Sequence, residues 1–171
     1  SAGLADRAQR DRAPYDAWCR DGQMIAVPGS SIDYDYVSTY LRDAMDDLGI
    51  EINQICFDRW RIDIFKKAAE ECGFAQMAEW LPVGQGYKDI SPRMESFEAK
   101  LLAKEIRHGG HPLLNMAAAN AIATMDAAGA KKLDKSKATQ RIDPAVAMIM
   151  ATHQVSEGNT HQEFDVAALI G

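Results

Sequence analysis

Hydrophobic positions in the middle of the chain recur at the spacing of an amphipathic helix. These positions are Val37, Leu41, Met45 and Leu48, and a glycine follows at position 49. Residues three or four apart lie on one face of a helix, so the pattern predicts a helix that buries one side. Asp33 or Ser31 can cap its start, and Gly49 can end it.

The next segments alternate between strand and helix patterns. An isoleucine-rich run ends in Phe57 before Asp58 and predicts a strand over residues 52–57. A helix with Gly73 as its stop follows, and its apolar face consists of Ile62, Phe65, Ala69 and Cys72. Residues 79–83 have the pattern of a second strand. This alternation indicates an α/β fold, and we expect the two strands to be parallel neighbours.

Further helices are predicted in the second half of the chain. Ser91-Pro92 predicts the start of a third helix, because proline is favoured at the first helical position, and Gly109-Gly110 predicts its end. The alanine-rich residues 111–130 favour a helix by propensity. A last helix is expected from Asp143-Pro144 to about residue 153.

The two ends of the chain have weaker patterns. Residues 1–22 are charged and predict a helical arm on the surface around Tyr15 and Trp18. The short apolar run 24–27 predicts a strand. The tail 156–171 is polar and then weakly apolar, and its pattern favours no element. Residues 1–171 are expected to form one domain.

Composition and charge narrow the class of protein. The formal net charge is −6, which argues against a protein that mainly coats nucleic acid. It does not argue against a nuclease, since metal-binding carboxylates add negative charge. The three cysteines are widely spaced and form no C-x-x-C motif, so a cytosolic protein without disulfides is expected. The longest apolar stretch is too short to cross a membrane, and no signal peptide pattern opens the chain.

Two aspartates are candidates for catalysis or metal binding, and each has a simpler explanation. Asp58 ends a predicted strand, where α/β sheets bind ligands. Asp143 precedes Pro144 at the start of a helix. Either residue can serve as a helix N-cap, and from local pattern alone capping is the favoured interpretation of both.

Basic side chains near these aspartates are candidates for contacts with phosphates. They are Arg59, Lys131, Lys132, Lys135, Lys137 and Arg141. A run of charges is more often a solvated face, and Asp134 interrupts this one. His108 and His111 are separated by two glycines and are poor zinc ligands without a C-x-x-C partner. No G-x-x-x-x-G-K-[ST] motif occurs, so ATPase activity is not expected within these residues.

The order of several motifs resembles a known family. The motifs are W-C-R-D-G at 18–22, V-P-G-S-S-I-D-Y at 27–34, F-D-R-W at 57–60, K-x-K at 135–137 and R-I-D-P-A-V-A at 141–147. Across residues 10–152 this succession resembles the C-terminal nuclease region of the large terminase subunits of tailed phages.

The resemblance implies a ribonuclease-H-like fold and a metal-dependent DNA endonuclease that cuts concatemeric phage DNA during genome packaging. In that family, acidic residues from the first strand, a middle strand and a late helix hold two divalent ions, Mg²⁺ or Mn²⁺. Asp58 matches the middle-strand acid and Asp143 the late-helix acid, so their side chains should converge. The resemblance also implies a strand over 121–125 and a turn at 126–129, and we prefer this to the propensity for helix.

The resemblance implies partners as well. They are double-stranded DNA in the cytoplasm of a bacterial host, other terminase subunits and the portal, with self-association left open. A non-catalytic fragment that docks DNA or a packaging partner is the alternative function. Another ribonuclease-H-like enzyme, such as a junction resolvase, is a third hypothesis, which the order of the motifs makes weaker.

One feature departs from the family. Its first strand, which carries an aspartate, should precede the region of Tyr15 and Trp18, but no apolar run ending in Asp occurs there. We therefore expect a fragment of a longer terminase or a remnant gene product. The edge beside residues 52–57 would then lack its neighbour, and we expect another segment or a second copy to fill it.

Overall fold

The chain folds as two compact units, residues 1–85 and 86–171, and each is described by itself. The structure, a computed structural model, describes residues 2–29, 31–60, 62–138 and 141–152. The tail 156–171, for which the sequence favours no element, lies outside these residues, and so does position 61. No helix in the described part of the chain is long and apolar enough to cross a membrane.

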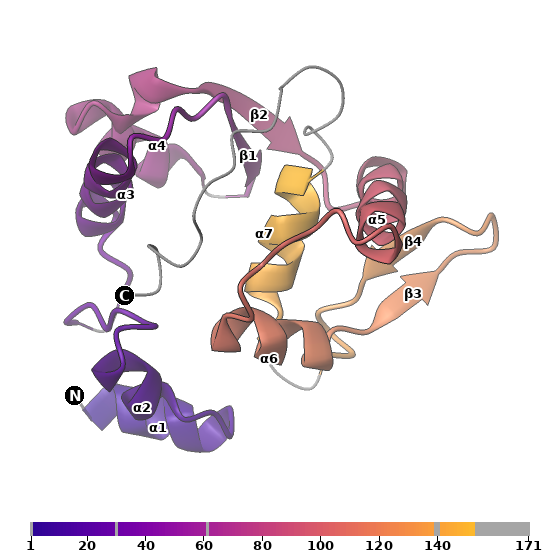
Figure 1. Ribbon diagram of the computed structural model, residues 1–171, viewed down its shortest axis with the longest axis horizontal. Helices are drawn as coiled ribbons and strands as arrows, with labels where there is room; N and C mark the ends of the chain where they lie inside the picture. Colours follow the sequence, from indigo (N-terminus) through magenta and orange to yellow (C-terminus); the bar gives the residue numbers. More distant parts are fainter. Residues whose placement is uncertain (1, 30, 61, 139–140, 153–171) are drawn as a thin grey trace. The chain divides into compact units, whose positions relative to one another are not determined.

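The first unit begins with two short helices, α1 (Ala2–Arg10) and α2 (Tyr15–Arg20) (Figure 1). The single helical arm predicted for residues 1–22 is therefore wrong in detail. Arg12 has a φ of 45° and Pro14 precedes α2, which together break the helix. The Tyr15 hydroxyl donates to the Asp11 carboxylate at 3.1 Å, and both residues are buried at this corner.

Residues 24–27 form no strand, so that prediction is also wrong. The backbone N–H groups of Gln23 and Met24 both donate to the carbonyl of Trp18, at 2.8 and 3.1 Å. The start of this run therefore folds back onto the end of α2. A short apolar run forms a strand only where another strand pairs with it, and among the described residues none does.

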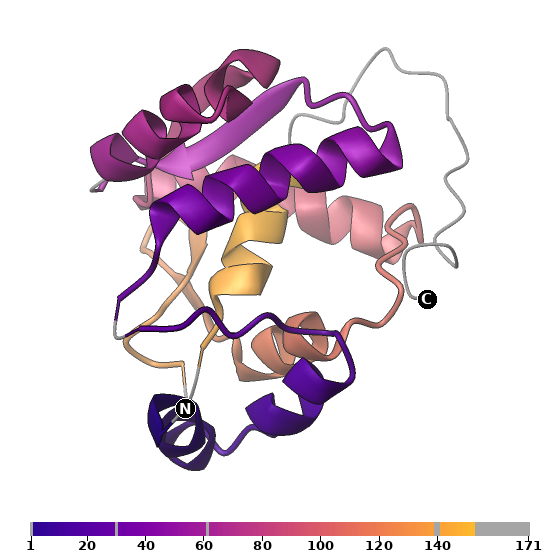
Figure 2. The ribbon, with the colours of Figure 1, turned by 90° about the vertical axis from the view of Figure 1, so that its left-hand side faces the viewer.

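The long helix α3 (Tyr34–Leu48) agrees with its prediction at both ends. The Asp33 carboxylate accepts a hydrogen bond from the Tyr36 N–H at 3.0 Å, which is an N-cap contact. Gly49 ends the helix with a φ of 62°, a left-handed conformation that glycine adopts without steric cost. Helix α3 packs against α4, and Figure 2 shows it in purple on the side that faces the viewer.

A strand–helix–strand arrangement completes the first unit. It consists of β1 (Gln54–Asp58), α4 (Ile62–Glu71), the 3₁₀ helix η1 (Phe74–Met77) and β2 (Glu79–Val83). The strands are parallel, with Gln54 opposite Glu79 and Asp58 opposite Val83. The predicted parallel pair is thus confirmed. Among the described residues only β2 pairs with β1, so no described segment fills the other edge of β1, and that part of the prediction is wrong. Pairing of this edge with a second copy of the chain stays a prediction.

Aromatic rings form the core between these elements. The Phe65 ring of α4 lies 6.1 Å from the Tyr34 ring of α3, 6.5 Å from Phe74 and 5.9 Å from Trp80, measured between centroids. Trp80 in turn lies 5.9 Å from Phe57 of β1. Aromatic rings bury large apolar areas and prefer such tilted contacts. Phe65 therefore joins α3, η1 and β2 in one cluster.

The described part of the second unit consists of three helices and a hairpin. These are α5 (Tyr87–Leu102), α6 (Pro112–Asn120), β3 (Ala123–Met125), β4 (Lys131–Leu133) and α7 (Asp143–Thr152). The strands β3 and β4 are antiparallel. The helix predicted for residues 111–130 ends at Asn120, and the strand that the family resemblance implies follows it, so the choice of the strand is confirmed.

The start of α5 differs from its prediction. The helix begins at Tyr87, with Gly86 at the N-cap position, and Pro92 lies inside it. Proline at the first helical position is only a preference, and here the chain continues the helix despite the missing N–H. The helix also ends at Leu102, well before the two glycines that were expected to stop it.

Buried polar contacts fix the hairpin and α7 against α5. The Ser91 hydroxyl is buried, donates to Glu95 at 3.1 Å and accepts from the backbone N–H of Lys131 at 2.9 Å. The buried Arg93 guanidinium donates to the carbonyl of Met150 at 2.7 Å. A cation suits the carbonyls at the end of a helix, so Arg93 stabilises α7 at its C-terminal turn.

We expect Asp33→Ala to lower the free energy of unfolding by about 1 kcal/mol, because it removes the N-cap of α3. Asp33→Asn should restore most of the loss, since asparagine caps a helix about as well. Urea denaturation followed by circular dichroism measures both variants. An alanine variant as stable as the parent chain would show that this cap does not matter.

We expect Ser91→Ala to lower the free energy of unfolding by about 1–3 kcal/mol, because the Lys131 N–H then loses its buried partner. Ser136→Ala is the matched control, since Ser136 is exposed and bonds only to nearby Asp134; it should change the stability by less than about 0.5 kcal/mol. Equal effects of the two substitutions would contradict this account of the hairpin.

Candidate metal and nucleic-acid site

Asp58 is the last residue of β1, and its side chain is exposed. Its carboxylate accepts a hydrogen bond from the backbone N–H of Trp60 at 3.1 Å. The helix α4 begins only at Ile62, so Asp58 does not occupy the N-cap position of that helix. The capping interpretation of Asp58 is therefore wrong. An exposed carboxylate at the carboxyl end of a parallel strand lies where α/β sheets bind ligands.

Asp143 is the first residue of α7, and its carboxylate faces a lysine. Lys135 Nζ lies 2.7 Å from Asp143 Oδ1, and both side chains are largely exposed, at 60% and 63%. Among the described residues, no backbone N–H of the first helical turn donates to this carboxylate. The capping interpretation of Asp143 is thus not supported, although a negative charge in the first turn still suits the helix dipole.

The two aspartates belong to different units, and their convergence on one ion stays a prediction. Carboxylate oxygens are the ligands that Mg²⁺ and Mn²⁺ prefer, so both side chains have suitable chemistry. Within the described ranges, no three or more His, Cys, Asp and Glu side chains are arranged to hold a metal ion. The donors are therefore of the right kind, but a complete ligand set is not present among these residues.

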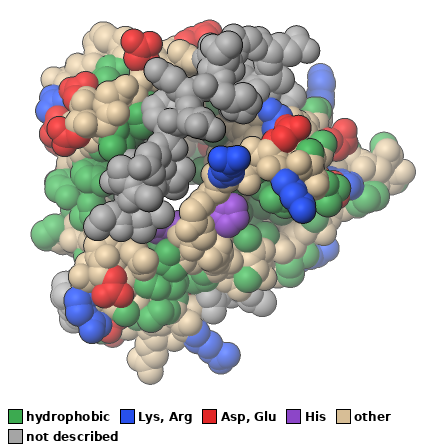
Figure 3. All heavy atoms as spheres, viewed as in Figure 1, with side chains coloured by type: hydrophobic (Ala, Val, Ile, Leu, Met, Phe, Trp, Pro, Cys, Tyr) green, Lys and Arg blue, Asp and Glu red, His purple; other side chains and the backbone are tan. Residues whose placement is uncertain are grey.

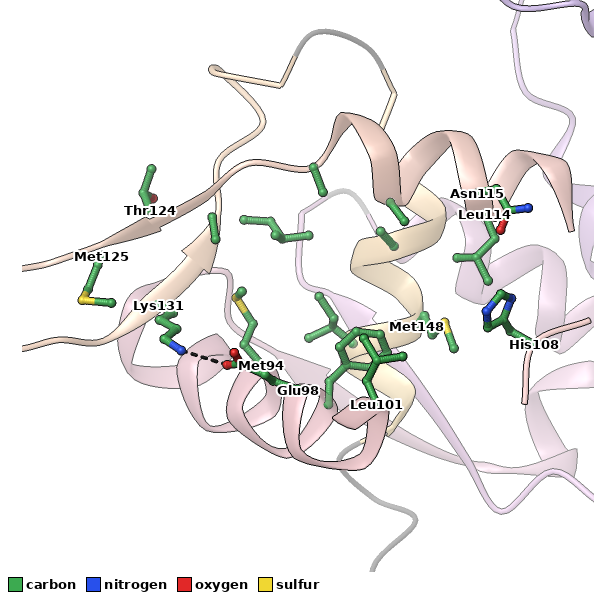
Figure 4. A pocket seen from close by; sticks show the side chains of 17 residues that line it. Met94, Glu98, Leu101, His108, Leu114, Asn115, Thr124, Met125, Lys131 and Met148 are labelled. Carbon is green, nitrogen blue, oxygen red and sulfur yellow. Dashed lines mark hydrogen bonds and ion pairs between the residues drawn. The ribbon is translucent and has the colours of Figure 1, made fainter. Parts of the chain in front are cut away.

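The basic residues proposed to contact DNA differ in the groups that their charged atoms contact. Lys131 on β4 lies 2.8 Å from Glu98 of α5, an ion pair drawn in Figure 4. The hydrogen bond to Glu98 and its negative charge raise the pKa of Lys131. Lys132 lies over the Tyr87 ring, 4.6 Å from its centroid. These two lysines therefore fix the hairpin to α5, which competes with binding to phosphates.

The loop between β4 and α7 carries two more of these lysines. Lys135 pairs with Asp143, and Lys137 Nζ lies 4.0 Å from Asp134. Hydrogen bonds from Ser136, with the charge of Lys137 as a smaller cause, hold the pKa of Asp134 below its ordinary value. Asp134 is therefore ionised at neutral pH and partly neutralises Lys137. Arg141 lies two residues before Asp143 and is exposed.

Arg59 is the basic candidate next to Asp58. Its side chain is exposed, and no described carboxylate pairs with it. Figure 3 shows basic and acidic side chains interspersed over the described part of the face in view. On this face, phosphate binding would therefore depend on individual cations and not on one extended basic surface.

Trp60 is a residue to which the sequence analysis assigned no role. It is 80% exposed and follows Asp58 and Arg59 directly. An aromatic residue beside an arginine at the end of a strand is the signal that could have indicated a contact with nucleic acid.

The second unit contains a cavity of about 600 Å³ between α5, α6, α7 and the hairpin (Figure 4). Its lining is mostly apolar, with Met94, Leu101, Leu114 and Met148 pointing into it. Neither proposed metal ligand lines it. The cavity therefore does not contain the proposed metal ligands, although Lys131 belongs to its lining.

The fold and these side chains define an α/β protein with exposed carboxylates at the end of a parallel strand and at the start of a late helix. Residues 2–159 match the model of the family described as terminase large subunit, endonuclease domain. The chain belongs to this family.

A relative and a solved structure agree with this assignment. The chain is 43% identical, over 165 residues, to the terminase large subunit of Enterobacteria phage HK97. That match covers 95% of this chain and 31% of the relative. The crystal structure of the HK97 bacteriophage large terminase matches with a TM-score of 0.81 and 43% identity, over 90% of this chain and 31% of that one. The chain thus spans about a third of the length of the relative.

We expect Asp143→Asn to change the free energy of unfolding by less than about 1 kcal/mol, because exposed ion pairs contribute little. Lys135→Met, which breaks the same pair from the other side, is the matched variant and should have an equally small effect. Urea denaturation measures both. A loss above about 2 kcal/mol for either variant would show that the pair is structural.

Proposed function

We propose that this chain is the endonuclease segment of a phage terminase large subunit and cleaves double-stranded DNA during genome packaging. The family match over residues 2–159 is the observation that carries the proposal. The α/β arrangement and the parallel strand pair support a ribonuclease-H-like fold. The proposed partners are DNA, other terminase subunits and the portal, and the proposed location is the cytoplasm of a bacterial host.

In this proposal Asp58 and Asp143 bind divalent ions, Mg²⁺ or Mn²⁺. Both carboxylates are exposed. Asp58 is the last residue of β1, and Asp143 lies in the first turn of α7. When bound, such ions would supply positive charge that stabilises the attacking and the leaving oxygen in a displacement at phosphorus. A further carboxylate is required for a robust pair, because two aspartates provide few ligands.

The residues of this chain have separate tasks in the proposed reaction. The hydrogen bond from the Trp60 N–H holds Asp58 at the end of β1. Lys135 neutralises Asp143 in the structure, so an ion must displace this lysine to bind the carboxylate. Arg59, the neighbour of Asp58, and the released Lys135 are then cations beside the two acids that can contact the DNA backbone.

The test of this function is nicking of supercoiled plasmid in the presence of Mn²⁺ by the purified chain. Asp58→Asn and Asp143→Asn should each reduce the nicking rate at least about a hundredfold, because each removes a metal ligand. Asp63→Asn and Asp89→Asn are matched controls, since these aspartates lie exposed in the first turns of α4 and α5. They should keep the rate within about twofold.

The same experiment separates the alternative function. A chain that binds DNA but does not nick it, even at high protein concentration, is a docking fragment and not an active nuclease. Binding of Mn²⁺, measured by electron paramagnetic resonance, should also weaken in both site variants and not in the controls. Nicking that survives both site substitutions would overturn the assignment of Asp58 and Asp143.

A further inference from the structure

Trp60 differs from the other tryptophans of the chain. Trp80 belongs to the aromatic core and its indole N–H donates to the carbonyl of Ala75 at 3.0 Å. Trp18 packs edge-on against Tyr15, with 5.7 Å between centroids. Trp60 is 80% exposed, the highest exposure among the described large hydrophobic residues, and contacts no described aromatic ring. Its ring is therefore available for a ligand.

The position of Trp60 is tied to Asp58. The N–H of Trp60 donates to the Asp58 carboxylate at 3.1 Å, so the backbone of the two residues forms one tight turn. A phosphate contacted by Arg59, which lies between these two residues, would consequently lie next to Trp60. The base attached to that phosphate would come within reach of the indole ring.

The surroundings of Trp60 suit a nucleic acid. Arg59 is an exposed cation with no described carboxylate partner. An aromatic ring beside a cation is the combination that proteins use to bind unpaired nucleic-acid strands, because every base can stack on an aromatic ring while the cation holds a phosphate.

We propose that Trp60 stacks on an unpaired nucleobase of a DNA strand whose backbone phosphate Arg59 contacts beside Asp58. This inference rests on the proposed function, because that function places DNA at Asp58. It adds a preference for DNA with unpaired bases, as at a frayed or cut end.

The test is binding of the full chain to a fluorescein-labelled oligothymidylate of about 12 nucleotides, measured by anisotropy in EDTA. Trp60→Ala should weaken binding about tenfold or more. Trp60→Phe should keep most of the affinity, because phenylalanine also stacks, whereas Trp60→Leu should behave like the alanine variant. Binding to a blunt duplex of equal length should change less than about twofold in all three variants.

Ile64 provides a matched control in the same unit. It is 54% exposed in the first turn of α4 and is not aromatic. If exposed apolar surface in general bound the oligothymidylate, leucine would replace Trp60 no worse than phenylalanine does, and Ile64→Ser would also weaken binding. Stacking requires that Ile64→Ser leaves oligothymidylate binding unchanged. An alanine variant of Trp60 that binds oligothymidylate like the parent chain would overturn the inference.

Arg59→Ala separates stacking from phosphate contact. It should weaken binding to single strands and duplexes alike and reduce the salt dependence, since it removes one phosphate contact. Because all binding is measured without divalent ions, absence of nicking would leave this result intact. Conversely, a nicking chain whose Trp60→Ala variant binds oligothymidylate normally would refute stacking while the proposed function stands.

Discussion

The position of Asp58 depends on the aromatic contacts around Phe65. This ring packs on Tyr34, Phe74 and Trp80, and Trp80 packs on Phe57, the residue before Asp58. Loss of the ring would remove the contacts that hold α3 and α4 beside the strand pair. In a small unit with a two-stranded sheet, side-chain packing of this kind must provide most of the stability, because an isolated strand pair is marginal.

Polar contacts have the corresponding task in the second unit. Ser91 holds the hairpin through the Lys131 N–H, and Arg93 holds the last turn of α7 through the carbonyl of Met150. Both side chains come from one turn of α5. This helix therefore orients α7, and with it Asp143, even though α5 provides neither proposed metal ligand.

The sequence predicts elements whose signals are local and strong. The helix between Asp33 and Gly49 has a cap and a glycine stop, and both have the expected geometry. The strand that ends at Asp58 was predicted from its isoleucine-rich run, which is also a local signal. Ser91-Pro92 was misleading, because a preferred position of proline does not prevent a helix from starting one turn earlier. Propensity alone would have extended a helix through β3, since alanine favours helix wherever tertiary contacts do not decide.

Contacts between distant residues could not be predicted in this way. Glu98 pairs with Lys131 across 33 positions, and no local pattern indicates that these residues meet. From the sequence, Lys131 was therefore predicted to be available for a contact with phosphate. The same holds for the candidate site, where the residue types and the strand end were predictable but the partners of each charge were not.

The division into two units has a chemical consequence. The three cysteines, Cys19, Cys56 and Cys72, are free thiols and all belong to residues 1–85. Each is partly shielded from solvent. A thiol reagent therefore modifies side chains of the first unit, and opening of that unit, which exposes these thiols further, increases the rate of alkylation.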